Sequence, residues 1–79
     1  MTEVQKFAQR LLERERASAA AQTLSYLDML AQAGEYASLA EELVTVSLER
    51  GTLTDEDRAE ALALPGLTAI HPALTPQSA

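Results

Sequence analysis

The side chains in this sequence that could do chemistry are carboxylates, and they are concentrated in one segment. Between positions 28 and 60 there are nine acidic residues against two arginines, a net charge of −7. The densest group is the run Asp55, Glu56 and Asp57. Such a run could bind a cation or a basic partner, and it could equally be the charged first turn of a helix. Calcium loops need ligands at alternate positions, a glycine turn and a closing glutamate, and this run lacks that pattern.

The other residue types needed for catalysis or metal binding are scarce. The chain has no cysteine and a single histidine, His71 between Ile70 and Pro72, so neither a thiolate nor a zinc site within one chain is expected. Serines and threonines are scattered without a nearby base, which gives a hydrolytic triad no support. We therefore expect a protein that is not an enzyme and that has no cofactor and no metal.

Length and charge narrow the class further. Seventy-nine residues make one small domain, and the net charge is −6. This charge disfavours nucleic acid and anionic membranes as partners, because both would repel the surface, and it favours a basic protein. The alternative is that the charge only keeps the protein soluble. No unbroken apolar run resembles a signal peptide or a membrane span, so a cytoplasmic location is expected.

Helical periodicity dominates the first half of the chain. Residues 1–33 contain no glycine or proline, and apolar residues recur at helical spacing after Thr2, a candidate N-cap. The stripe stops at residues 13–16 and resumes out of phase at Ala17. This shift predicts two helices, 2–16 and 18–33, with Ser18 as a weak cap of the second, in preference to one long helix.

Glycines and a hydroxyl cap divide the second half. Gly34 and Gly51 are placed as helix stops, and Thr54 before three carboxylates predicts a helix start. The expected helices are 35–50 and 54–64. The fold class is thus all-α, a small bundle of three to four short helices. Residues 1–64 form the helical domain, and residues 65–79 form an irregular, proline-containing tail that is partly disordered beyond residue 74. Leu67, Ile70 and Leu74 could pack back on the bundle.

The core is expected around the helix 35–50. Leu43 should face the interior with Leu39 and Val46, and Leu27 and Leu62 should join them from neighbouring helices. The two tyrosines, Tyr26 and Tyr36, could fill this core or lie partly exposed in an interface. Helices this short with tight connections should pack side by side.

Two short sequence motifs in residues 33–64 resemble those of a known family. They are the helix start Gly34-Glu35-Tyr36 and the turn from Gly51 to Arg58, of the type Gly-x-Leu-Thr-x-Glu-x-Arg. This segment resembles the core of the MafI-type immunity proteins of bacterial polymorphic-toxin and contact-dependent inhibition systems. The alanine-rich first third and the proline-bearing tail depart from that pattern.

The resemblance implies a cytoplasmic helical protein that binds and neutralises a cognate protein toxin. If the toxin is a nuclease, its groove is basic, and an acidic inhibitor gains steering and specificity from opposite charge. The candidate partner-binding residues are the acidic clusters with the adjacent tyrosine: Glu35, Tyr36, Glu41, Glu42, Asp55, Glu56 and Asp57. The alternative is a small homo-oligomeric adaptor without a toxin partner, in which the helix 18–33 with Tyr26 and Leu30 would cover a second copy.

Overall fold

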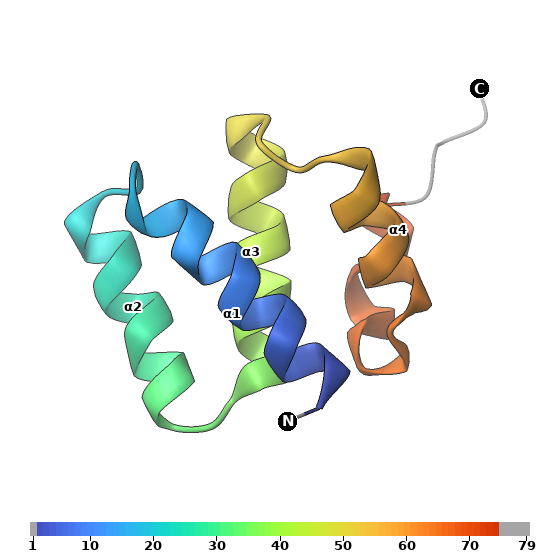
Figure 1. Ribbon diagram of the computed structural model, residues 1–79, viewed down its shortest axis with the longest axis horizontal. Helices are drawn as coiled ribbons and strands as arrows, with labels where there is room; N and C mark the ends of the chain where they lie inside the picture. The colour runs from blue at the N-terminus through green and yellow to red at the C-terminus, as the bar shows by residue number, and fades with distance from the viewer. Residues whose placement is uncertain (1, 75–79) are drawn as a thin grey trace.

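The structure, a computed structural model, describes residues 2–74, in which all regular elements are helices. The elements are α1 (Glu3–Arg16), α2 (Ala21–Gln32), α3 (Tyr36–Arg50), α4 (Asp55–Ala63), the 3₁₀ helix η1 (Pro65–Ile70) and α5 (His71–Leu74). α2 and α3 are antiparallel, α1 crosses in front of them, and the C-terminal elements lie on the other side of α3 (Figure 1). The all-α prediction and the four longer helices are confirmed.

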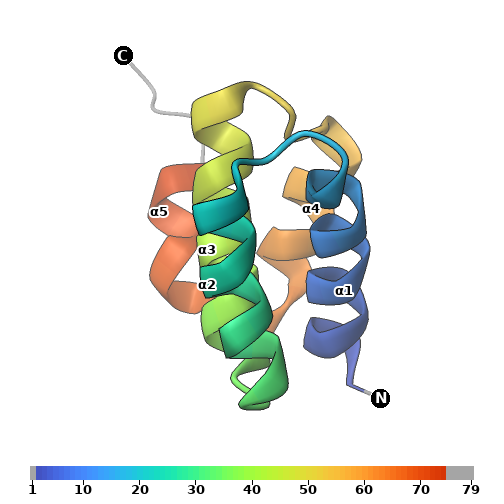
Figure 2. The ribbon, with the colours of Figure 1, turned by 90° about the vertical axis from the view of Figure 1, so that its left-hand side faces the viewer.

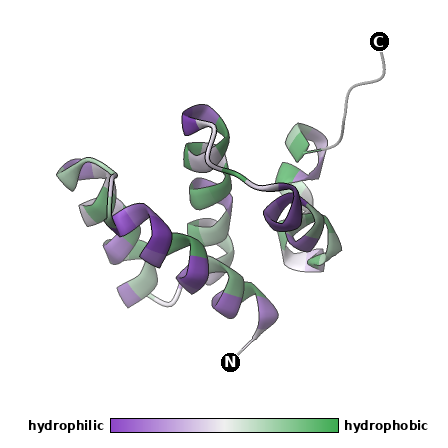
Figure 3. Ribbon diagram, turned by 45° about the horizontal axis from the view of Figure 1, so that its top comes forward, coloured by the Kyte–Doolittle hydropathy of each residue, from purple (hydrophilic) through white to green (hydrophobic). Residues whose placement is uncertain are grey.

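α1 owes its stability to its cap and to its apolar face. The Gln5 backbone N–H donates to Thr2 Oγ1 at 3.1 Å, which confirms Thr2 as the N-cap. Phe7 and Leu11 recur at helical spacing and are wholly buried. The opposite face of α1 is hydrophilic (Figure 3). Burying one face of an amphipathic helix is the main source of its stability in a protein.

The break between the first two helices is real, but its cap was predicted wrongly. α2 begins after Ala20, which has no side-chain cap bond. The Ser18 and Ala19 backbone N–H groups both donate to the Glu15 carbonyl, so the chain is still finishing α1 at these positions. The Ser18 hydroxyl instead accepts a hydrogen bond from Arg50 at 2.8 Å. This contact comes from α3, more than thirty positions away, and no local pattern indicated it.

Glycines end the second and third helices as expected. Gly34 has φ 76° and Gly51 has φ 70°, the left-handed conformation that only glycine adopts without steric cost. The Thr52 backbone N–H reaches back to the Ser47 carbonyl at 2.9 Å, which closes α3. These two turns reverse the chain and set α3 between α2 and the C-terminal elements (Figures 1 and 2).

The core lies around α3, with two corrections to the predicted set. Leu27, Leu39 and Leu43 are wholly buried, as expected. Val46 is only partly buried, and Val44 takes the interior position. Leu62 is 36% exposed, because α4 turns Ala61 inward instead. α4 has only nine residues, and several adjacent alanines and leucines leave its apolar face undefined in the sequence.

The described part of the predicted tail is helical and packed. Leu67 and Leu74 are buried and Ile70 is partly buried, so the helical fold extends through Leu74 and does not stop at residue 64. Arg58 Nη1 donates to the Leu74 carbonyl at 2.7 Å, and His71 Nε2 lies 3.2 Å from the Ala61 carbonyl. These bonds tie α5 to α4, and they give His71 a role that the sequence did not indicate. The expected disorder of residues 75–79 lies outside the described residues.

Candidate protein-binding surface

Ion pairing divides the acidic residues into two equal groups. Lys6 and four of the five arginines pair with carboxylates, and Arg58 binds a backbone carbonyl. The paired acidic residues are Glu3, Glu13, Glu15, Asp28, Asp57 and Glu60. Within residues 2–74 no ion pair involves the remaining six, which are Glu35, Glu41, Glu42, Glu49, Asp55 and Glu56. The whole net charge of −6 therefore corresponds to these six residues.

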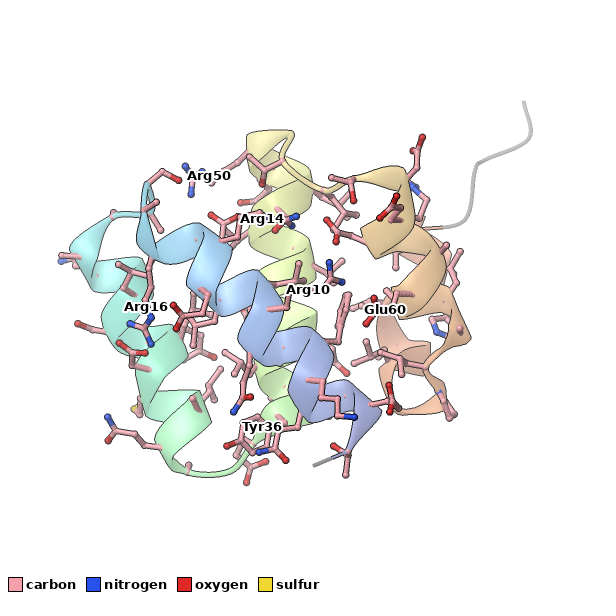
Figure 4. The ribbon with its side chains drawn as sticks, viewed as in Figure 1. Arg10, Arg14, Arg16, Tyr36, Arg50 and Glu60 are labelled. Atoms are coloured by element: carbon pink, nitrogen blue, oxygen red, sulfur yellow. The ribbon has the colours of Figure 1, made fainter. Side chains whose placement is uncertain are left out.

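Asp57 is a structural residue at the junction of α1 and α4. Its side chain is fully buried and accepts from Arg10 Nη1 at 2.9 Å on one oxygen and from Arg14 Nη2 at 2.8 Å on the other. It also accepts from the Thr54 backbone N–H at 2.9 Å, while its own backbone N–H donates to Thr54 Oγ1, a complete capping box. Arg10 extends the network to Glu60 (Figure 4).

The electrostatic balance at Asp57 favours the charged form. Burial raises the pKa of the carboxyl group, but the Thr54 N–H and the Arg14 guanidinium lower it more, so the pKa lies below its usual value. This carboxylate is satisfied within the protein and inaccessible to a partner. Its assignment as a partner-binding residue is wrong, and the physical reason is the pair of arginines supplied by α1.

Glu15, in the last turn of α1, forms a second buried charge cluster. Its carboxylate is nearly fully buried and pairs with Arg50 of α3. The hydroxyls of Ser47 and Thr52 donate to its Oε1 at 3.3 and 3.1 Å. Arg50 and the loop between α1 and α2 lie together in Figure 4. The sequence analysis missed Glu15, although its position one turn after Leu11 and Leu12, on the apolar side of α1, was a usable signal.

Three of the six unpaired carboxylates form a stripe along α3. Glu35, Glu42 and Glu49 are seven residues apart, which is two helical turns, so they lie on one face. Glu35 and Glu49 are exposed, and Glu41 and Glu42 are half-buried. The stripe from residue 35 to residue 49 is about 21 Å long at 1.5 Å per residue.

Of the other three unpaired carboxylates, Glu41 is also on α3, and the remaining two form a separate cluster at the start of α4. Asp55 and Glu56 are both exposed in the first turn. The start of α4 lies beyond the C-terminal end of α3, whereas Tyr36 lies at the opposite end of α3 (Figures 1 and 4). The predicted residues are therefore not gathered in one patch. Tyr36 itself is half-buried and packs against the core, so it contributes little free surface.

One pocket of about 270 Å³ lies at the upper end of α2 and α3, lined by Ser18, Ala19, Ala20, Thr23, Val46 and Arg50. None of its side chains is a free nucleophile beside a base. No group of three or more metal-binding side chains is found in residues 2–74. Within the same range no helix has the length and apolar character needed to cross a membrane.

Comparisons of this chain with models of known families, with curated proteins and with solved structures found no match.

Proposed function

We propose that this protein is an inhibitory binding protein that recognises a cationic protein through its unpaired carboxylates. The observation that carries the proposal is the separation of charges described above. The fold uses every cation internally, and six carboxylates remain on α3 and at the start of α4. An unbalanced acidic face attracts a basic protein surface, accelerates encounter and disfavours nucleic acid and anionic lipid.

The partner class comes from the resemblance of residues 33–64 to the MafI-type immunity proteins. On this basis the partner is a cognate bacterial protein toxin with a basic binding surface, for which a nuclease is the clearest case. The protein acts in the cytoplasm by occupying the active site or an exosite of the toxin. Catalysis by the protein itself has no part in this function.

Co-expression with the protein encoded immediately upstream of its own gene tests the proposal, because immunity genes follow their toxin genes. We expect the two proteins to be recovered as one complex and the cells to survive toxin expression. Recovery of the two proteins separately, with no protection of the cells, would contradict the proposal.

Two charge-reversal variants locate the contact. Glu41→Lys/Glu42→Lys changes the α3 surface, and Asp55→Lys/Glu56→Lys makes the same change in charge at α4. Asp57 has to stay unchanged, since its reversal would break the ion pairs that hold α1 to α4. We expect at least one variant to lose protection while its circular dichroism stays helical. If both protect as well as the parent at physiological salt, the acidic surface only aids solubility.

A further inference from the structure

The outer face of α2 is uncharged and has no partner in the described part of the chain. Its exposed side chains share one side of the helix, being mostly three or four positions apart: Gln22, Ser25, Tyr26, Met29, Gln32 and Ala33. Tyr26 is 45% exposed and Met29 is 56% exposed. Asp28, the only charged residue of α2, is paired with Arg16. Exposed tyrosine and methionine on an uncharged helix face are typical of the centre of a protein interface.

Helical geometry places Tyr26 at the border with α3. Asp28 faces α1, where it meets Arg16, and Tyr26 lies about 200° away around α2 at 100° per residue. Figure 2, viewed from the side of α2, shows α3 behind α2 and α1 beside the two. Thr23 is three positions before Tyr26 and lines a pocket with Val46 of α3, so Tyr26 lies on the side of α2 that borders α3.

The same geometry places the acidic stripe at that border. Val46 of α3 and Thr23 of α2 line one pocket, which fixes the side of α3 that faces α2. Glu42 and Glu49 are four and three positions from Val46, and therefore lie along this side toward solvent. The uncharged face of α2, with Tyr26 and Met29, therefore borders the acidic stripe of α3.

We infer that this α2–α3 face binds a basic amphipathic helix of the partner, an inference that rests on the proposed function and names its site. The apolar side of that helix packs on Tyr26 and Met29, and its lysines and arginines pair with Glu42 and Glu49. A helix laid along two antiparallel helices uses the recognition mode in which apolar anchors give affinity and flanking charges give orientation. The acidic stripe matches about four turns of such a helix.

Charge decides against a second copy of this chain as the occupant. Each copy carries a net charge of −6, and the acidic stripe borders the uncharged face of α2. Self-association through this face would bring two sets of unpaired carboxylates together, and like charges across an interface are strongly unfavourable. A basic helix removes this repulsion.

A defined peptide tests the inference without the natural partner. The probe is an amphipathic helical peptide of about 18 leucine and lysine residues, long enough to span the stripe. A peptide of the same composition in shuffled order, which has no apolar face, is its control. Both are titrated into the ¹⁵N-labelled full chain at an ionic strength of about 0.15 M, where charge is screened beyond about 8 Å. We expect the amphipathic peptide to shift amide signals of α2 and α3 and to bind at least tenfold more tightly than the control.

Three double variants show whether the peptide binds at the α2–α3 face or is attracted only by the net negative charge. Tyr26→Ala/Met29→Ala removes the anchors, and Glu42→Gln/Glu49→Gln removes two charges from the stripe. Asp55→Asn/Glu56→Gln removes the same number of charges at α4. We expect each of the first two to weaken binding by about tenfold, as for small interface hot spots, and the third by less than about threefold.

Results that contradict the α2–α3 site can be distinguished from results that contradict the proposed function. If the shifts centre on residues 55 and 56, or if all three variants bind equally, the α2–α3 site is wrong while an acidic binding protein remains. If neither peptide binds, the inference is wrong, and the co-expression experiment judges the function independently. A dimer in sedimentation equilibrium that dissociates in Tyr26→Ala/Met29→Ala would show that a second copy covers the face.

Discussion

Asp55, Glu56 and Asp57 are consecutive carboxylates with different roles. The first two are exposed and unpaired, whereas Asp57 is buried among Thr54, Arg10 and Arg14. A buried carboxylate without these donors would carry a large desolvation penalty. The acidic run thus combines one structural residue with two that are free to bind.

Replacing Asp57 should destabilise the fold, and replacing its neighbour should not. Asp57→Ala removes a capping box and two ion pairs, but Arg10 and Arg14 can turn toward solvent. We therefore expect a loss of about 2 kcal/mol in the free energy of unfolding. Asp55→Ala is the matched control, with a loss under about 1 kcal/mol. Urea denaturation measures both, and equal losses would contradict the structural role of Asp57.

The same residue predicts a pH dependence. The pKa of Asp57 is lower in the folded than in the unfolded chain, so its contribution is present above the unfolded pKa of about 3.9 and is lost as pH falls through the folded pKa. The melting temperature of the parent should therefore fall below about pH 4 more steeply than that of Asp57→Ala. Parallel curves for the two proteins would show that Asp57 does not supply this dependence.

Sequence reasoning could not distinguish Asp57 from its neighbours. All three carboxylates fit the first turn of a helix, and a helix N-terminus favours each of them. The difference comes from Arg10, 47 positions away, and from Arg14 beside it on α1. Such pairing depends on how α1 packs against α4, which no local pattern encodes.

At the scale of elements, α1 is held to each of its neighbours by charge as well as by apolar packing. Glu15 pairs with Arg50 on α3, Arg16 with Asp28 on α2, and Arg14 with Asp57 on α4. The first and third pairs contain a buried carboxylate, whereas the second is exposed on both sides. Their contributions to stability should differ accordingly.

Arg50→Met tests the ion pair between α3 and α1, in which Glu15 is buried and Arg50 is partly exposed. It leaves the Glu15 carboxylate buried with only the hydroxyls of Ser47 and Thr52 as donors. We expect a loss of about 3 kcal/mol in the free energy of unfolding, as for other buried pairs that lose one partner. Arg16→Met removes an exposed arginine and should cost under about 1 kcal/mol. If Arg50→Met unfolds at the same urea concentration as Arg16→Met, Glu15 is not held as described.

Substitution of a buried and of an exposed leucine tests the packing of the core. Leu43 is wholly buried at the centre of α3, and Leu62 is 36% exposed on α4. Leu43→Ala should cost about 2–5 kcal/mol in the free energy of unfolding, a large part of the stability of so small a domain. Leu62→Ala should cost less than half as much. A thermal midpoint of Leu43→Ala within a degree or two of the parent would contradict this packing.

Helix ends were predictable where the sequence has a clear capping residue or a terminating glycine. Gly34, Gly51, Thr2 and Thr54 fixed helix ends through conformational and capping preferences that act within a few residues. The inward face of α4 and the packing of residues 65–74 were not predictable. Both are short, and their orientation depends on contacts with α1 and α3 that form only in the folded chain.

At the scale of the whole molecule, internal pairing leaves the surface charge uneven. The dimensions are 37 × 26 × 18 Å, so an acidic stripe of about 21 Å is long relative to the molecule. The sequence indicated the excess negative charge and its location in residues 28–60. It did not indicate that the arginines of α1 would form ion pairs within the protein. Because they do, they do not neutralise the carboxylates on the surface of α3.

The association rate of the partner as a function of salt tests the central claim most directly. The protein encoded upstream is mixed with the parent and with Glu41→Lys/Glu42→Lys in stopped flow, at ionic strengths from about 0.05 to 0.5 M. Electrostatic steering predicts that the parent rate falls about tenfold or more over this range. It also predicts that the variant associates more slowly at low salt and changes little as salt rises. Rates that coincide for the two proteins and do not vary with salt would contradict recognition through the acidic surface.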